Sequence, residues 1–289
     1  MAGPRLWPWL AGSGGGQSPP VGMTNVANTN ISIGGTANTK GSWVQISASL
    51  PWDVAGVIVN HQDTGGTTDG TMLYDIGVGS AGNEYAVIEN IYNLNNRVST
   101  STRVPMLCGR FFPIALKAGQ RLAARAQASV TTAKSPSISL SLIRGHPGMV
   151  GGKNRVIAIG ADTSTSAGTV IGSSSSTTLS AWTQLTGSCP ADVVANMPYV
   201  FNPTTADPAA SIRAFANIGI GASGSEHPLV ERLITMSVTG MDMTGPTDPA
   251  PANWLPCFIP AGSRVVAQQK NQTSTTNTAL QCIVYGLVA

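Results

Sequence analysis

Trp43–Val54, WVQISASLPWDV, decides the fold, because it is repeated 139 residues later as Trp182–Val193, WTQLTGSCPADV. Six positions carry the same residue in both stretches. A match of this length at one fixed spacing points to a duplicated structural unit. Functional residues are therefore expected in the parts of the chain that the two copies do not share.

Three further pairs of segments follow in the same order along the chain. They are Asp75–Glu84 with Asn217–Glu226, Leu116–Leu122 with Ile259–Val265, and Ile143–Gly145 with Val284–Gly286. Their spacings are 142, 143 and 141 residues. Spacings that drift so little across four blocks indicate a duplicated domain.

The hydrophobic pattern within each copy is typical of β-strands. Apolar and polar residues alternate from Trp43 to Ser47 and from Ser137 to Leu142, as in strands with one buried face. Turn-forming residues rich in Gly, Asn, Thr and Asp separate the segments. Arg121–Ser129 has alanines that would suit a helix, but its repeat, Arg264–Gln269, reads as a strand. We therefore expect an all-β protein of two tandem, jelly-roll-like β-sandwiches.

The repeats also predict how the chain is divided. We expect an extended N-terminal anchoring arm over residues 1–40 and a first sandwich over 41–145. A linker rich in Ser, Gly and Thr would span 146–179, and the second sandwich would span 180–289.

The composition favours a chain that packs against neighbouring molecules. Charged residues make up 10% of the sequence, against about 25% in average soluble domains. Such a surface has little repulsion to keep copies apart; the alternative is a secreted β domain with many Ser/Thr turns. The net charge of +3 is spread over the chain and the first 40 residues hold only Arg5 and Lys40 as basic residues, so direct nucleic-acid packaging is not expected.

The N-terminal segment predicts a docking peptide. Proline interrupts its apolar run, which argues against a signal peptide, and no other stretch approaches the roughly 20 apolar residues of a membrane span. A glycine-rich run over residues 12–16 would give it reach. The alternative is a tail whose tryptophans have no role. The predicted partner-docking residues are Leu6, Trp7, Trp9 and Leu10.

Catalytic and cofactor motifs are weak. Asp53 recurs as Asp192 and Glu84 as Glu226, so a glycosidase-like carboxylate pair in each copy is one interpretation. An acid kept at a turn in both copies is more simply a turn cap. The two G-x-G-x-x-G stretches lack the strand-turn-helix context of a nucleotide site. We expect no enzyme activity and no cofactor.

The four cysteines are not spaced like metal ligands, and no metal site is expected. Buried reduced thiols are favoured, while a Cys257–Cys282 bridge between strands stays open as an alternative.

The residues carry a family resemblance. Tyr74–Glu84, the turn Pro260–Arg264 and the charge-poor, Ser/Thr/Asn-rich composition resemble structural proteins of tailed-bacteriophage particles, of the head-decoration, spike, fibre or tail-appendage type. The resemblance implies a homo-oligomer, with a trimer favoured, located in the virion and assembled in the host cytoplasm. Its implied partners are other virion proteins, with no membrane and no cofactor.

Two functions follow as expectations. The first is a non-enzymatic virion component that decorates the capsid or forms a head spike or fibre base, docked through the N-terminal arm. The alternative is a tail or neck appendage that acts as a carbohydrate- or receptor-binding adhesin. For this adhesin, Trp52 and Trp254 are the candidate glycan contacts, and Tyr92 and Tyr199 are further candidates, all four expected on exposed sandwich loops where they could stack on sugar rings.

Overall fold

The computed structural model describes residues 23–63, 70–95, 110–130, 136–145, 153–172, 178–201, 212–237, 254–271 and 280–289. All regular structure in these residues is β-strand, which confirms the predicted all-β class. No helix in this part of the chain is long and apolar enough to cross a membrane.

The strands follow one another along both halves of the chain. In chain order they are β1 (Met23–Asn30), β2 (Val44–Ser47), β3 (Val54–Asp63), β4 (Gly70–Val78), β5 (Tyr85–Asn95), β6 (Arg110–Phe112), β7 (Leu122–Ala128), β8 (Pro136–Arg144), β9 (Val156–Ile159), β10 (Ala161–Asp162), β11 (Ala167–Ile171), β12 (Thr183–Thr186), β13 (Val193–Phe201), β14 (Ile212–Ile220), β15 (His227–Ser237), β16 (Val265–Asn271) and β17 (Leu280–Val288).

The first sandwich is a jelly roll of two four-stranded layers. One layer has the order β1-β8-β3-β6, and the other has the order β2-β7-β4-β5. Inward-facing residues such as Val57, Leu140 and Ile76 from both layers are fully buried in one core. The alternation in β8, where Ile138, Leu140 and Leu142 point inward, produces this layer as the sequence predicts.

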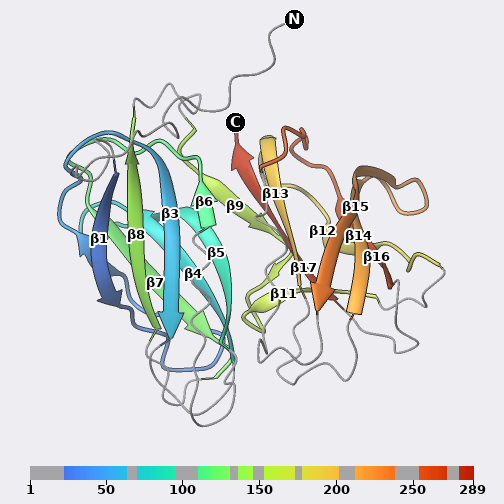
Figure 1. The fold of residues 1–289 in the computed structure, drawn as a ribbon, viewed down its shortest axis with the longest axis horizontal. Helices are drawn as coiled ribbons and strands as arrows, with labels where there is room; N and C mark the ends of the chain where they lie inside the picture. Colours follow the sequence, from blue (N-terminus) through green and yellow to red (C-terminus); the bar gives the residue numbers. More distant parts are fainter. Residues whose placement is uncertain are drawn as a thin grey trace, which may run out of the picture.

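The second sandwich repeats this order (Figure 1). One layer is β12-β16-β14-β15, matching β2-β7-β4-β5. In the other layer β17 and β13 match β8 and β3, while β9 and β11 together take the place of β1 on β17. The short β10–β11 hairpin interrupts this strand, and it has no counterpart in β1. The predicted duplication is thus confirmed in three dimensions.

The strand pairing corrects the last of the four sequence matches. Gly56 lies opposite Ile143, and its repeat Ala195 lies opposite Leu287. Ile143 therefore corresponds to Leu287 and not to Val284, so the final spacing is 144 residues, not 141. The error arose because both strands carry a short apolar run, and a short motif aligns equally well in a wrong register.

The two sandwiches share one sheet. β5 of the first pairs in parallel with β9 of the second at Ile88 and Val156, which joins the layers into a sheet of nine strands. The predicted linker over 146–179 is therefore wrong where it contains β9, β10 and β11. The predicted arm over 1–40 is wrong from residue 23 onward, because β1 pairs with β8. In both places hydrogen bonding to a buried neighbouring strand outweighs a polar, turn-like composition.

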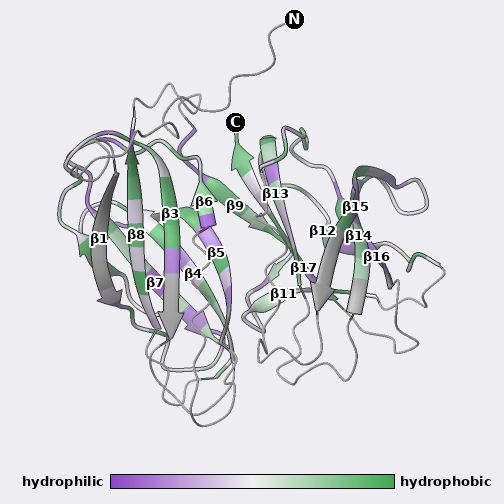
Figure 2. Ribbon diagram, viewed as in Figure 1, coloured by the Kyte–Doolittle hydropathy of each residue, from purple (hydrophilic) through white to green (hydrophobic). Residues whose placement is uncertain are grey.

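A continuous hydrophobic core crosses the boundary between the sandwiches. Figure 2 shows hydrophobic residues on β9, β13 and β17, which lie between the two halves. Met197, Tyr199 and Ile283 of these strands belong to the core of the first sandwich, whereas Val200 and Val284 face the core of the second. The layer β9-β17-β13 is therefore apolar on both faces, as expected for a strand layer buried on both sides.

Candidate functional site

The aspartates that repeat between the copies organise turns. Asp53 Oδ1 accepts a hydrogen bond from the Ala118 amide at 2.8 Å, and Asp192 Oδ1 accepts one from Ala261 at 2.7 Å. Each bond fixes the turn before a strand, at Gly119 with φ of 81° and Gly262 with φ of 79°. The interpretation of these acids as turn caps is confirmed.

The repeated glutamates lie in a second pair of matching contacts. Glu84 accepts from the Gly82 amide at 2.8 Å and from Arg121 at 2.6 Å. Glu226 accepts from the Gly224 amide at 2.9 Å and from Arg264 at 2.8 Å. These carboxylates link the glycine-rich loop to the residue that directly precedes β7 in the first copy and β16 in the second, so each acid is held by groups of its own copy.

Acid is expected to weaken this loop. The Arg264 hydrogen bond holds the pKa of Glu226 below its ordinary value of 4.5. A depressed pKa in the folded state gives stability that is complete above the unfolded value and is lost as pH falls through the folded value. Glu226→Gln is therefore expected to flatten the fall in unfolding free energy below pH 4.5, measured by urea denaturation across pH. Glu231→Gln, which alters an exposed acid on β15, should keep the wild-type slope; equal slopes in both variants contradict the assignment.

Asp75 and Asn217 have the same backbone role in the two copies. Asp75 Oδ1 accepts from the Asn90 amide at 2.9 Å, and Asn217 Oδ1 accepts from the Arg232 amide at 2.9 Å. Asn90 and Arg232 both have positive φ, at 50° and 58°, at irregularities in β5 and β15. The side chain supplies the acceptor that the interrupted ladder cannot give.

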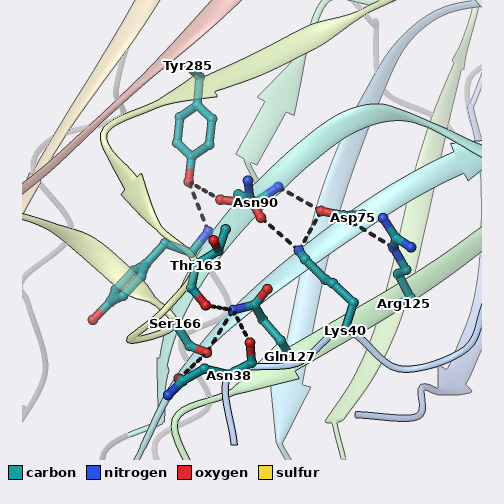
Figure 3. Close-up of polar contacts among 10 residues, drawn as sticks. Asn38, Lys40, Asp75, Asn90, Arg125, Gln127, Thr163, Ser166 and Tyr285 are labelled. Carbon is teal, nitrogen blue, oxygen red and sulfur yellow. Dashed lines mark hydrogen bonds and ion pairs between the residues drawn. The ribbon is translucent and has the colours of Figure 1, made fainter. Parts of the chain in front are cut away.

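The first copy adds charges to this position. Lys40 Nζ lies 2.7 Å from Asp75 Oδ1, and Arg125 Nε lies 2.9 Å from Asp75 Oδ2. Lys40 also donates to the Asn90 side-chain oxygen at 2.7 Å (Figure 3). Burial lowers the pKa of Lys40 from its ordinary value, against the opposing effect of Asp75. The repeat has Leu179, Asn217 and Gln268 at these three positions, so the charged set belongs to the first copy alone.

A polar set around Gln127 attaches the β10–β11 hairpin to the first sandwich. The Gln127 amide donates to the Thr163 carbonyl at 2.6 Å and to Ser166 Oγ at 3.0 Å. Ser166 Oγ in turn donates to Asn38 Oδ1 at 2.7 Å. Figure 3 shows these side chains beside the Lys40–Asp75 pair. The β10–β11 hairpin, which is found only in the second copy, is thus hydrogen-bonded to the first sandwich.

Aromatic residues from both copies form what we call the junction: Tyr92, Phe112, Tyr199, Phe201 and Tyr285. Tyr92 stacks on Phe201 with 4.0 Å between ring centroids, and Phe112 meets Tyr285 edge to face at 5.8 Å. All five side chains are buried. Edge-to-face and offset rings of this kind are the geometries that aromatic pairs prefer.

Polar contacts fix the junction in place. Tyr285 Oη accepts from the Tyr92 amide at 2.9 Å and donates to the Asn90 carbonyl at 3.3 Å. The Arg110 guanidinium lies 4.1 Å from the centre of the Tyr199 ring and donates to the Tyr92 carbonyl at 2.6 Å. Burial raises the pKa of Tyr92 well above its usual range, so its ring stays neutral. The last strand of the chain thereby caps an irregular strand of the first sandwich.

The structure places the aromatic candidates for glycan binding as follows. Tyr92 and Tyr199 are buried in the junction, so their suggested exposure on loops is wrong. Trp52 and Trp254 are partly buried against the larger core. The Trp254 indole donates to the Phe111 carbonyl at 2.8 Å, which adds a second link between the copies. Glycan contact by Trp52 and Trp254 stays a prediction.

The repeated tryptophans have a structural role at the sheet surface. The alternating strand pattern that contains Trp43 and Trp182 predicts core residues, but both side chains are only half-buried. They cover Gly77 and Gly219, where an added Cβ would come within 2.6 Å and 3.0 Å of the rings. Arg125 also lies over the Trp43 ring, 4.4 Å from its centre. The repeated glycines therefore permit close approach of an indole ring.

Other predicted residues have simpler outcomes. Leu6, Trp7, Trp9 and Leu10 lie outside the described residues. Cys189, Cys257 and Cys282 are free thiols, so the alternative of a Cys257–Cys282 bridge is not realised. Within the described ranges no three His, Cys, Asp or Glu side chains gather as metal ligands would.

Sequence reasoning missed Lys40, Arg125, Gln127 and Tyr285. The first two are charged at positions where the repeat is uncharged, and this difference was visible in the aligned copies. Gln127 is the partner of an inserted hairpin, which no pattern within one copy announces. Tyr285 was obscured by the wrong register of the last strand.

Comparisons with known proteins identify no family for this chain. No protein-family model and no curated protein matches the sequence. The structure is similar to PNGase F, a glycosylasparaginase from Flavobacterium meningosepticum, with 12% identity over 92% of this chain and 96% of that one, at a TM-score of 0.36. PNGF-II is similar with 10% identity over 92% of this chain and 66% of that one, at a TM-score of 0.38. The STIV MCP, a viral major capsid protein, is similar with 12% identity over 90% of this chain and 95% of that one, at a TM-score of 0.35.

Proposed function

We propose that this chain is a non-enzymatic structural component of a bacteriophage particle, assembled as a symmetric homo-oligomer on the virion surface. The observation that carries the proposal is the union of the two sandwiches by a shared nine-stranded sheet and a buried aromatic junction. This union makes a broad, rigid building block, in which the second copy extends the sheet of the first.

The uses of the repeated polar groups support a structural role. Asp53 and Asp192 accept from turn amides, and Glu84 and Glu226 pair with arginines of their own copy. An acid engaged by an arginine and a backbone amide has its acceptor capacity committed to the fold. The carboxylates that the sequence offers for acid–base chemistry therefore serve the scaffold.

The surface supports assembly. Tyr85, Val170, Leu179 and Phe258 are large apolar side chains that are each about half exposed. Together with the 10% charged composition, they leave a surface with little electrostatic barrier to association. Many weak contacts repeated on a symmetric particle would add up through avidity. Capsid decoration, a head spike or a fibre base are the positions that suit such a block.

Attachment to the particle is assigned to the N-terminal segment. Deleting residues 1–22 ends just before β1, so the folded block should stay intact. The truncated protein is expected to keep its oligomeric state and lose attachment to particles, measured by co-sedimentation with particles that lack the protein. Substitution of Trp7 and Trp9 with alanine should reproduce the loss within the full-length chain. Full attachment by the truncated form contradicts the anchoring role.

A further inference from the structure

The two copies differ in how one corresponding strand is covered. In β5 of the first copy, Val87, Ile88 and Ile91 are buried, at 2%, 0% and 0% exposure. Their counterparts in β15 are Leu229, Val230 and Leu233, which are only partly buried. The cause is visible in the sheet order, because β9 of the second copy lies along β5. In the part of the chain that the structure describes, no strand lies along the outer edge of β15.

The other half of this contact is also open. β9 lies between β17 and β5, with Val156 opposite both Leu287 and Ile88. Its counterpart β1 pairs with β8, with Met23 opposite Ile143, which is the residue equivalent to Leu287. Among the described strands, β1 has no neighbour on its other side. The edge of β1 therefore corresponds to the edge that β9 presents to β5.

The contact between β5 and β9 is thus complete within the chain. The equivalent edges, that of β15 and that of β1, each lack a partner strand among the described residues. Open strand edges with unpaired backbone groups are templates for pairing with another chain. The two edges lie in different sandwiches, with β1 at the left of the view and β15 in the right half (Figure 1). A single chain therefore does not bring them together, whereas two chains do.

We propose that β15 of one chain receives β1 of a second copy in parallel, with Val230 opposite Met23, as Ile88 lies opposite Val156 within the chain. This inference rests on the proposed homo-oligomer and names its contact. Because the two surfaces differ, the association is head to tail, and it closes into a ring or extends according to the rotation at each step.

The faces beside the two contacts explain why one is internal and the other lies between chains. Beside β9, the second copy presents Tyr199 and Tyr285, which bury against the first sandwich. The corresponding residues in the first copy are Asn60 and Ser141, both partly exposed. A polar face tolerates water before assembly, whereas an aromatic face needs permanent cover. The contact between chains would accordingly be weaker than the internal one.

Cysteine cross-linking tests the register. Neighbouring strands lie about 4.8 Å apart, within the roughly 4.4–6.8 Å Cα separation of disulfides. One protein carries Met23→Cys and a second carries Val230→Cys, and the two are mixed under mild oxidation. We expect a covalent dimer in the mixture at least about tenfold above either protein alone. Mixing Met23→Cys with Ala181→Cys, an exposed residue before the opposite edge strand β12, controls for chance collision and for the native thiols.

A charge substitution tests the same edge without cross-linking. Glu231→Arg puts a bulky cation on the exposed face of β15, and Ala181→Arg puts it beside β12. Light scattering should show a loss of association for Glu231→Arg alone. Oligomers that keep forming without the Met23–Val230 cross-link overturn this inference and leave the proposed function standing. A chain that stays monomeric up to millimolar concentration, near the effective concentration of tethered sites, overturns the proposed homo-oligomer itself. If β15 instead pairs with another segment of its own chain, Glu231→Arg should associate as fully as the wild type. That result also overturns the proposed contact.

Discussion

Replacing Phe201 with alanine is expected to lower the free energy of unfolding by about 3–5 kcal/mol, the usual cost of removing a buried phenylalanine ring. Phe201 has no exposed surface, and its ring stacks on Tyr92 of the other sandwich. The substitution therefore opens a cavity where the two copies meet. Urea denaturation followed by circular dichroism measures the change.

Phe258→Ala is the matched control for this variant. Phe258 lies in the same half of the chain but is 54% exposed, so its removal should change stability by less than about 0.5 kcal/mol. If the junction joins the sandwiches into one cooperative unit, the wild type unfolds in a single transition and Phe201→Ala broadens or splits it. Equal stabilities for Phe201→Ala and Phe258→Ala would show that the junction contributes nothing.

Asp75→Ala is expected to cost about 3–5 kcal/mol, because it removes the one carboxylate that both partly buried cations, Lys40 and Arg125, contact. Asp75 has a side-chain exposure of 4% and contacts both Lys40 and Arg125. It also accepts the Asn90 amide at the irregularity of β5. One substitution thus removes two ion pairs and a backbone cap, and the loss is measured by chemical denaturation at neutral pH.

The second copy offers a neutral form of the same site as a control. Asp75→Asn combined with Lys40→Leu reproduces the pair Asn217 and Leu179. This double variant should recover most of the lost stability, because the amide oxygen still caps Asn90 and no buried ammonium remains. Asn217→Ala should cost only about 1 kcal/mol, the net value of a hydrogen bond. A double variant as unstable as Asp75→Ala would mean that packing, not charge, determines the loss.

The predictable part of the fold came from repetition. Period-2 patterns and the matched turns at Gly119 and Gly262 predict β-strands in both copies. The place of β9 and β11 was not predictable in this way, because 146–179 is rich in small polar residues and its pairing is decided by β17, more than 100 residues later. Local composition says little about a strand whose partner is so distant.

The candidate site divides along the same line. Residues that repeat, such as Asp53 and Glu84, were interpreted correctly because one structural role had to fit the same residue in both copies. Lys40 and Arg125 act only in the first copy, so a search for shared motifs passes over them. Tyr92 and Tyr199 were misplaced on loops because an aromatic residue on a strand facing another domain has the same sequence pattern as one facing solvent.

The position of β17 has a consequence for the time course of folding. β17 pairs with β9, β11 and β13, and its Tyr285 reaches Asn90 and Tyr92. Contacts between residues so far apart in sequence carry a large loop-closure cost, and chains dominated by them fold slowly. During synthesis the first sandwich can form from its own strands before the last residues are made. The aromatic face that packs against it is complete only when β17, with Tyr285, has been synthesised. The newly made chain therefore passes through a stage with β5 uncovered, and protection of that edge by another molecule would matter most at that stage.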